Sequence, residues 1–269
     1  MTAERDPALY AMVPEAYKKA GRIQVATNAP FAPFEMFSAD GQKKLTGLEI
    51  DLGHVLGQRL GVPFEFSQQP FDGLLPGLQA KKYDVLMAAL FDTAAREKSI
   101  DFVNYGRSGS VLLVRKGDPG DVKTLDDLCG KQAAAQTGAQ QISLLDQQTK
   151  KCVADGKKGV TVRTYPQFSD ALLALKTSKT DLIAGDLGAL RYAAKRDTSV
   201  EAVEDPAAPN GYDPQSIGIG LPKGQPKFRE AVRRALADLI EDGSYRKILD
   251  TYGVGNIAVD KPTVNQVRS

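Results

Sequence analysis

The sequence contains no tryptophan, one histidine (His54) and two cysteines in 269 residues. With so few imidazole and thiol groups, a histidine-based metal site and a Ser-His-Asp triad both lack their usual components. We interpret His54, which falls inside a predicted helix, as a packing or surface residue. Neither a GxxxxGK[ST] nor a GxGxxG motif is present, so nucleotide binding has no support. We therefore expect no metal, no cofactor and no catalytic residue.

Charges of the two signs nearly balance, with 35 Lys and Arg against 33 Asp and Glu, for a formal net charge of +2. They are interspersed along the chain without a block of like charge, which argues against nucleic acid as a partner. No stretch approaches 18 consecutive apolar residues, and the first residues lack the pattern of a signal peptide. We expect a soluble chain.

The two cysteines, Cys129 and Cys152, enclose a loop of about 24 residues. A disulfide between them would stabilise the fold by roughly 3.5 kcal/mol in the chain-entropy model. Two unrelated buried thiols are the alternative, because an even count of two is weak evidence for pairing. A bonded pair would favour an oxidising compartment and imply that a targeting segment has been removed.

Predicted strands alternate with predicted helices along the whole chain, which is typical of an α/β fold. Residues 22–27, 64–69 and 83–90 predict strands, and residues 46–61 predict a helix that ends at Gly61. A short helix is expected over residues 72–82. The first hundred residues therefore predict one mostly parallel sheet.

A second unit of the same kind follows an apolar strand predicted over residues 110–121. A similar strand is predicted within residues 210–224, and two such strands would suit crossings between two lobes. Further elements are expected over residues 124–148, 159–165 and 180–186, and a helix is expected to start at Ser169. Residues 228–253 carry an apolar stripe at helical spacing, and the last ten residues or so read as a loose end.

Three polar residues follow predicted strands, where ligands bind in open α/β sheets: Asn28, Arg96 and Asp186. Thr93 is a natural N-cap, which places Arg96 in the first turn of a helix, where the helix dipole disfavours a cation. An anionic partner should therefore compensate Arg96. The structural alternatives are an ion pair between Arg96 and Asp92 and a helix-capping role for Asp186.

Five further residues stand near these positions. Gln140 and Gln141 follow a turn at Gly138, where a helix start would offer backbone N–H groups to an anion. Phe31, Phe71 and Phe91 lie close to strand ends, as core residues or as the wall of a ligand site. The residues alone thus predict a two-lobed α/β protein with an anion site and a cation site.

Five segments, in order, resemble those of the extracellular solute-binding proteins of polar amino-acid ABC importers, the family of histidine-, glutamine- and lysine/arginine/ornithine-binding proteins. They are "TNAPFAPFEM" (27–36), "TGLEIDL" (46–52), "FDGLLPGLQAKKYDVLMAAL" (71–90), "DTAAREKSIDFVNY" (92–105) and "LIEDGSYRKILDTYG" (239–253). The resemblance implies a periplasmic-binding-protein-like α/β fold of type II, with two lobes joined by two hinge strands and a ligand cleft between them. The lobes would be residues 1–110 with 217–269, and residues 111–216.

The resemblance also implies the role of each site residue. Arg96 would clamp a ligand carboxylate, Asp186 would receive the ammonium group, and the backbone N–H of Gln140 would add to the carboxylate site. Phe31 and Phe71 would sandwich the ligand side chain. The positions that would complete the ligand-binding set are Asn28, Ala89, Phe91, Gln136, Gln141 and Gly185. The Cys129–Cys152 pair recurs in a branch of the family with the same "DLCGK" context, which implies a disulfide.

Two departures from the family pattern affect the expected ligand. Phe91 stands where most members have a Ser or Thr that binds the ammonium group, and Ala89 can offer only its backbone. Asn28 is neutral where members selecting cationic side chains have an acid, which disfavours arginine or lysine. A polar amino acid is the first expectation, and a cyclic or N-substituted zwitterion of the ectoine, betaine or opine kind, held by aromatic faces through cation–π attraction, is the alternative.

Two other readings come from different classes of protein. Cyclohexadienyl dehydratases are similar to this family, and an enzyme of that kind would need a general acid, for which Glu35 and Glu49 are the nearby candidates. A ligand-binding domain from a receptor is the other. The resemblance favours a non-enzymatic, monomeric binding protein that delivers its ligand to a membrane ABC permease. It would be periplasmic, or extracellular and tethered to the cell surface.

Overall fold

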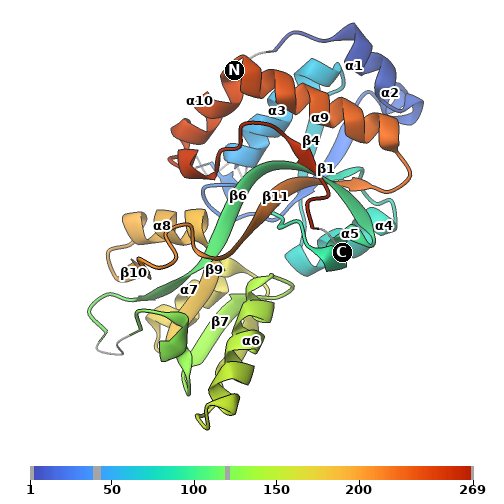
Figure 1. The fold of residues 1–269 in the computed structure, drawn as a ribbon. Coiled ribbons are helices and arrows are strands. Elements are labelled where there is room, and N and C mark those ends of the chain that lie inside the picture. Colours follow the sequence, from blue (N-terminus) through green and yellow to red (C-terminus); the bar gives the residue numbers. More distant parts are fainter. Residues whose placement is uncertain (1–2, 39–43, 119–121, 268–269) are drawn as a thin grey trace. The chain divides into compact units, whose positions relative to one another are not determined.

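A computed structural model describes residues 3–38, 44–118 and 122–267 of the chain (Figure 1). The chain divides into two compact units, which are described separately below. Unit 1 comprises residues 1–107 and 215–269, and unit 2 comprises residues 108–214. The boundaries fall within two long strands, β6 (Ile100–Arg115) and β11 (Tyr212–Pro222). No helix in the described ranges is both long and apolar enough to cross a lipid bilayer.

Unit 1 has a mixed sheet in which the first three strands are parallel, in the order β4-β1-β5-β11-β6. Strand β11 is antiparallel to β5, and β12 is antiparallel to β6. The remaining strands of the unit are β1 (Ile23–Thr27), β4 (Phe64–Gln68), β5 (Val85–Leu86), β12 (Thr263–Val264) and the hairpin β2 (Met36–Phe37) with β3 (Leu45–Thr46). The expected parallel sheet is confirmed for β1, β4 and β5.

Helices of unit 1 cover both faces of this sheet. They are α1 (Pro7–Met12), α2 (Glu15–Ala20), α3 (Leu48–Leu60), α4 (Leu74–Gln79), α5 (Ala94–Glu97), α9 (Pro226–Glu241) and α10 (Ser244–Thr251), with short 3-10 turns η1 (Phe71–Gly73) and η3 (Gly255–Ile257). Because side chains alternate between the faces of a strand, Ala26 of β1 packs on α4, whereas the neighbouring Val25 lies on the side of Phe66, which contacts α3.

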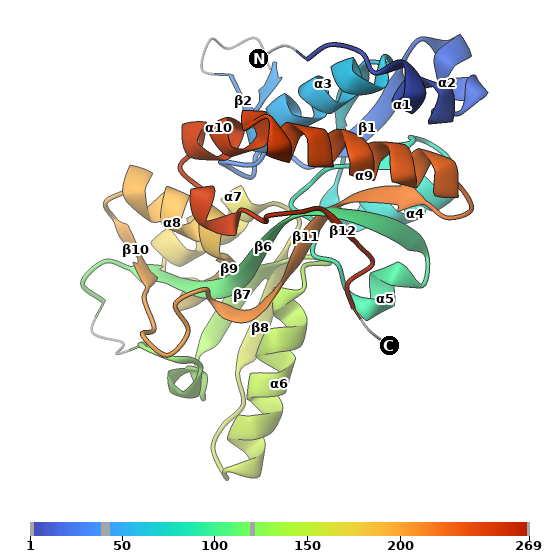
Figure 2. The same ribbon diagram turned by 45° about the horizontal axis from the view of Figure 1, so that its top comes forward.

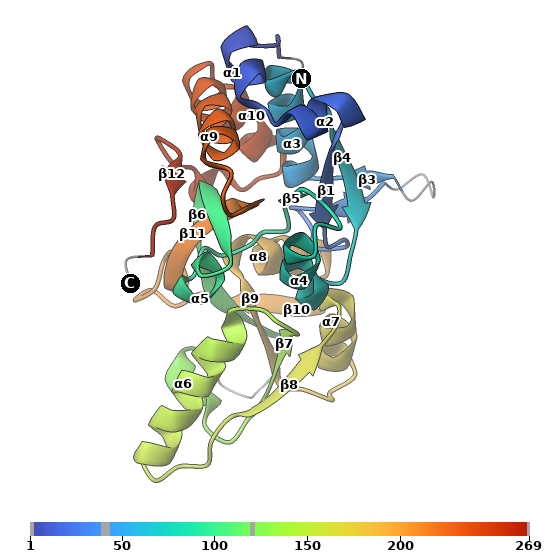
Figure 3. The same ribbon diagram turned by 90° about the vertical axis from the view of Figure 1, so that its right-hand side faces the viewer.

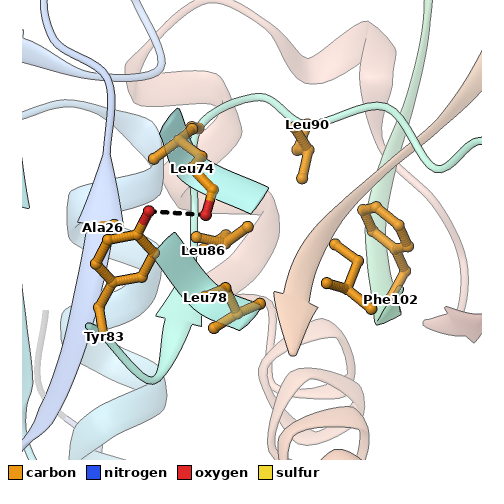
Figure 4. Close-up of a cluster of buried hydrophobic side chains, with 9 residues drawn as sticks. Ala26, Leu74, Leu78, Tyr83, Leu86, Leu90 and Phe102 are labelled. Atoms are coloured by element: carbon orange, nitrogen blue, oxygen red, sulfur yellow. Dashed lines mark hydrogen bonds between the residues drawn. The ribbon is translucent and has the colours of Figure 1, made fainter. Parts of the chain in front are cut away.

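The α4 side of the sheet is built on a cluster of buried side chains that includes Leu74, Leu78, Leu86 and Phe102 (Figure 4). Tyr83 lies at the edge of this cluster and donates its hydroxyl hydrogen to the Leu74 carbonyl at 2.7 Å. Burial of these apolar side chains away from water stabilises the unit. It fixes the strand ends from which the polar residues below project.

Unit 2 has a four-stranded core in the order β6-β9-β7-β8, and β10 (Val200–Val203) pairs with β6. Strands β7 (Gln132–Gln136), β8 (Thr161–Tyr165) and β9 (Leu182–Asp186) are parallel. The turn η2 (Leu125–Leu128) and helix α6 (Gln141–Ala154) pack on one face through Leu145 and Cys152, and α7 (Phe168–Lys176) and α8 (Leu187–Arg196) cover the other. The expected disulfide is confirmed, since Cys129 is bonded to Cys152.

Most predicted elements are confirmed, and two differ in extent. Helix α3 ends at Gly61 in a left-handed cap, as expected. The strand predicted over residues 83–90 is only two residues long, because Ala89 has a positive φ of 46° that no strand accommodates. The apolar strand predicted over residues 110–121 corresponds to the second part of β6, which ends at Arg115; residues 119–121 of that prediction lie outside the described residues.

The expectation of a loose end after residue 260 is wrong for the part that the structure describes. Residues 259–267 lie on unit 1 and include β12, which continues the sheet next to β6. Figure 2 shows this dark red segment running from β12 toward α5. The sequence pattern missed it because two-residue strands carry no periodic signal.

Candidate functional site

Candidate residues of unit 1 follow the carboxyl ends of three parallel strands, which meet at one edge of the sheet. Asn28 follows β1, Phe71 follows β4, and Ala89 follows β5. Asn28 is buried and donates its amide hydrogen to the Gln69 carbonyl at 2.7 Å. Register therefore brings Asn28, Phe71 and Ala89 to a common edge of the sheet.

Arg96 projects from α5, a single turn whose N-cap is Thr93, as expected. The Thr93 hydroxyl accepts the backbone N–H of Arg96 at 3.3 Å. The guanidinium Nη1 donates to the Phe91 carbonyl at 2.8 Å, and its Cζ lies 5.8 Å from the centroid of the Phe71 ring. The structure thus brings together Arg96, Phe71 and Phe91.

The guanidinium of Arg96 is in an unfavourable environment for a cation. Burial lowers its pKa to about 10, and the nearby Asp92 carboxyl opposes the shift only in part. Its planar fork suits a bidentate pair with a carboxylate, and such a partner would compensate the desolvation. Burial, rather than the helix dipole considered from the sequence, is thus the cause of the lowered pKa of Arg96.

The aromatic candidates differ in exposure. Phe91 is almost fully buried, at 5% exposed, and pairs with Ile217 of β11 through a β-bridge. Phe31 is half-buried, and its ring stacks on that of Phe34 with centroids 6.0 Å apart. Phe71 is half-buried as well. Phe31 and Phe71 thus keep part of their surface available for a ligand, whereas Phe91 is largely a core residue.

Glu49 is a residue whose position the sequence reasoning left undecided. It is fully buried on α3, where its Oε2 accepts the Ala89 N–H at 2.8 Å and its Oε1 accepts the Tyr105 hydroxyl at 2.7 Å. Glu49 therefore fixes the N–H of Ala89, whose φ of 46° lies in the left-handed region. The sequence did carry a signal for the burial of Glu49. Glu49 stands three residues before Leu52, which places it on the apolar face of the predicted helix.

Candidate residues of unit 2 also gather at one edge, beyond the carboxyl ends of β7 and β9. Gln136 ends β7 and donates to the Pro166 carbonyl at 3.1 Å. Gln141 begins α6 and donates its side-chain amide to the Ser110 hydroxyl at 3.1 Å. Register places Ser110 opposite Asp186 on β9. Ser110, which the sequence did not single out, therefore lies between Gln141, which donates to it, and Asp186, which stands opposite it on the neighbouring strand.

Helix α6 starts without a side-chain cap, because its N-cap residue Gln140 makes no such hydrogen bond. The preceding Gly138 has a φ of 81°, in the left-handed region that glycine favours. First-turn N–H groups of a helix have no intrahelical acceptor, so this end suits an anion. Gly185 lies at the end of β9, where a Cβ would approach Leu190 to 3.0 Å.

Asp186 is the buried acid of this edge, with 4% of its surface exposed. Its Oδ1 accepts the Ala189 N–H at 3.1 Å and so caps α8, whereas Oδ2 is buried and has no hydrogen-bond partner among the described residues. Burial raises the pKa of Asp186, although the Ser108 hydroxyl and the N–H groups of Ala189 and Gly188 oppose the shift. Asp186 therefore caps α8, as the structural alternative predicted, and it also keeps one buried carboxyl oxygen that has no hydrogen-bond partner among the described residues.

Metal binding finds no support within the described ranges, where no group of three or more His, Cys, Asp or Glu side chains is arranged to hold an ion. His54 is exposed on α3 and makes an edge contact with Phe66, with ring centroids 5.7 Å apart. Burial of part of the ring lowers the pKa of His54. His54 is thus a surface residue with one aromatic contact, in agreement with the expectation of a packing or surface residue.

Comparisons with known proteins agree on one family. The sequence profile of the bacterial extracellular solute-binding proteins of family 3 matches residues 23–255. The arginine-binding protein of Corynebacterium glutamicum is 28% identical over 262 residues, covering 97% of this chain and 83% of that protein. The lysine/arginine/ornithine-binding periplasmic protein of Escherichia coli K12 is 30% identical over 259 residues, covering 93% and 92%.

Among solved structures, an ancestral amino acid-binding protein described as a precursor of cyclohexadienyl dehydratase superposes with a TM-score of 0.78. It is 26% identical and covers 88% of this chain and 98% of its own. Sequence and structure comparisons thus extend over nearly the whole described chain.

Proposed function

The chain belongs to family 3 of the bacterial extracellular solute-binding proteins, and on that premise we propose that it captures a small zwitterion for an ABC importer. The zwitterion is an amino acid or an amino-acid-like solute, which a membrane permease receives from the protein. Arg96 binds the carboxylate of the ligand, and Asp186 receives its cationic group. Capture follows from closure of the two units on the ligand.

One observation carries this proposal: each unit places a charged side chain whose pKa is shifted by burial at the carboxyl edge of its parallel strands. The pKa of Arg96 is lowered to about 10 and that of Asp186 is raised, both by burial. The two charges are of opposite sign, so a ligand that carries both a carboxylate and a cation relieves both desolvation costs. A ligand with one charge would relieve only one.

The other candidate residues receive supporting roles in the proposal. Ala89 contributes its carbonyl, and Gln140 contributes its backbone N–H. Phe31 and Phe71 present aromatic faces. Selection of the ligand side chain falls to Asn28, Phe91, Gln136, Gln141 and Gly185.

A polar amino acid is the first candidate ligand, because the relatives are named for arginine and for lysine, arginine and ornithine. The second is a zwitterion with a substituted or cyclic cation. It is favoured by the aromatic surface next to Arg96, where Phe71 lies 5.8 Å from the guanidinium carbon and the position of Phe91 supplies no hydroxyl. Aromatic faces bind a cation that has few N–H donors.

The hydrogen bonds of Glu49 support the proposal that the protein binds its ligand without catalysing a reaction on it. Both of its carboxyl oxygens accept hydrogen bonds within the core, from Ala89 and Tyr105, which leaves it poorly placed to act as a general acid. We expect no product when the protein is incubated with prephenate or arogenate and absorbance is followed. Turnover of either compound would replace this proposal with an enzymatic one.

The proposed location is the periplasm or the outer cell surface, and the proposed state is a monomer. The Cys129–Cys152 disulfide fits an oxidising compartment. Sedimentation of the ligand-free protein would test the monomer.

Arg96→Ala is the direct test of the carboxylate site. A thermal-shift screen over amino acids, opines, betaines and ectoine identifies the ligand, and calorimetry then measures its affinity. We expect the variant to bind about 2 kcal/mol more weakly or worse, since the ligand anion is left buried without its partner. The matched control is Arg22→Ala, an exposed arginine of unit 1 in a surface ion pair with Glu65, which should bind normally. Unchanged affinity in Arg96→Ala would contradict the proposed site.

A further inference from the structure

The C-terminal strap, defined here as residues 259–267, lies beyond the region that the family profile matches. Strand β12 within it pairs with β6, with Thr263 opposite Asn104 and Val264 opposite Val103. The strap then continues toward α5, as Figures 2 and 3 both show. It therefore joins two parts of unit 1 that are distant from it in the sequence.

Two backbone N–H groups of the strap donate hydrogen bonds to the two acids on either side of Arg96 in the sequence. The Gln266 N–H donates to Asp92 Oδ2 at 2.8 Å, and the Val267 N–H donates to Glu97 Oε1 at 2.9 Å. Asp92 is fully buried, and burial together with the neighbouring Asp92 carboxyl raises the pKa of Glu97. Removing the Gln266 donor would leave the buried Asp92 Oδ2 with the Asn104 amide as a donor, and removing the Val267 donor would take one hydrogen bond from the half-buried Glu97.

The strap has its own anchor on the sheet, independent of α5. The Asn265 side chain accepts the Phe102 N–H at 2.8 Å and donates to Asp101 Oδ1 at 3.1 Å. Asn265 has a φ of 47°, a left-handed conformation that asparagine tolerates better than most residues. At the start of the strap, the Val259 N–H donates to the Tyr245 hydroxyl at 3.1 Å. Anchors on both sides allow the strap to transmit restraint to α5.

Helix α5 needs such restraint, because it has four residues and a single turn cannot hold its own geometry. Its other supports include the Thr93 cap and the Asp92 N–H bonded to the Ser216 carbonyl at 2.9 Å before Arg96, and the Ser99 N–H bonded to the Arg96 carbonyl at 2.9 Å after it. The strap bonds both Asp92 and Glu97, one on each side of Arg96. Without it, the end of the turn after Arg96 would lose a tether.

We propose that the C-terminal strap is a positioning element for Arg96, which fixes the one-turn helix so that the guanidinium is preorganised for an anionic group. The ligand consequence rests on the proposed function of Arg96, whereas the positioning itself does not. Preorganisation lowers the cost of ordering a binding group at the moment of binding.

The test compares two truncations of the full chain. The first ends after Lys261 and removes β12 together with the donors Gln266 and Val267; the matched control ends after Val267 and keeps every strap contact described above. Two measurements need no ligand: hydrogen exchange of the amides of residues 93–99, and the rate at which phenylglyoxal modifies Arg96. We expect both to rise about tenfold in the first truncation, while amides of α3 exchange as in the control.

A purely structural role for the strap would raise exchange throughout unit 1, α3 included, and that result would overturn the proposal. Unchanged exchange and unchanged Arg96 modification would overturn it as well. Val267→Pro, which removes one donor and keeps the rest of the strap, should give a smaller change in the same direction and guards against misfolding of the truncation.

The consequence for binding is measured with L-arginine and its carboxylate-free analogue agmatine. We expect the truncated protein to lose about tenfold in affinity for L-arginine and to change little for agmatine, since only the former engages Arg96 through a carboxylate. Equal losses for both compounds would contradict positioning of Arg96. If the parent chain binds no zwitterion in the panel, the proposed function fails, and the ligand-free measurements still decide the role of the strap.

Discussion

Asp186 combines two tasks that conflict in energy. Its Oδ1 caps α8, which stabilises the fold, whereas its buried Oδ2, which has no hydrogen-bond partner among the described residues, makes the ionised form costly. Functional acids commonly carry such a cost, because the ligand supplies the missing partner. The residue therefore offers a way to separate stability from binding.

We predict that Asp186→Asn raises the free energy of unfolding at neutral pH by about 1 kcal/mol, because asparagine keeps the cap and removes the buried charge. The same variant should bind the cationic end of the ligand more weakly. Chemical denaturation and calorimetry measure the two effects. Asp146→Asn, at an exposed position of α6, is the control and should change neither. A loss of stability in Asp186→Asn would show that the carboxylate is better compensated than the structure indicates.

The pH dependence of stability follows from the raised pKa of Asp186. The folded protein holds the proton more tightly than the unfolded chain, so the contribution of Asp186 to stability is complete below its ordinary pKa and is lost as pH rises through the raised value. Denaturation curves across this range should show that slope in the parent and not in Asp186→Asn. Identical slopes in the two proteins would assign the effect to other groups.

At the scale of elements, α3 does more than cover the sheet. Glu49 joins it to the turn after β5 and to β6, through Ala89 and Tyr105. The Tyr105 carbonyl in turn accepts the Tyr245 hydroxyl of α10 at 2.5 Å. This buried chain of hydrogen bonds supports the strained turn at Ala89.

Glu49→Ala should lower the free energy of unfolding by about 3 kcal/mol, since it leaves the Ala89 N–H and the Tyr105 hydroxyl buried without an acceptor. Urea denaturation gives the measurement. Glu65→Ala, an exposed acid of β4 in the same unit, should cost far less, because surface ion pairs contribute little. Comparable losses in the two variants would mean that water replaces Glu49 as the acceptor.

At the scale of the whole molecule, the two units differ in their covalent restraint, because the disulfide lies entirely within unit 2. It ties η2 to α6, and Cys152 is fully buried among the residues that pack α6 on the sheet. A closed loop of this length reduces the entropy of the unfolded chain.

Replacing both cysteines, Cys129→Ala with Cys152→Ala, should lower the stability of unit 2 by about 3 kcal/mol. Hydrogen exchange resolved by segment is the measurement, with α6 reporting on unit 2 and α3 on unit 1. We expect faster exchange in α6 alone. Equal acceleration in both helices would show that the units unfold together, and a reducing agent should have no effect on the variant.

Much of the molecule was predictable from local patterns. The alternation of strands and helices predicted an α/β fold, and the five family-like segments implied its periplasmic-binding-protein-like form, the family and the solute-binding role, all of which the relatives confirm. The Thr93 cap and the end of α3 at Gly61 were also correct, because caps depend on residues a few positions apart. The individual ligand contacts stay predictions.

What the sequence by itself determined, then, is the order of the elements, the disulfide partners and the charged residues at strand ends, all of which follow from local spacing or from family motifs. Only the tertiary structure decided the left-handed turn at Ala89, the acceptor role of Glu49 and the docking of residues 259–267 on α5. Those features depend on hydrogen bonds between residues 40 to 174 positions apart. Local propensity carries no information about such pairs, because burial brings them together only when the sheet is complete.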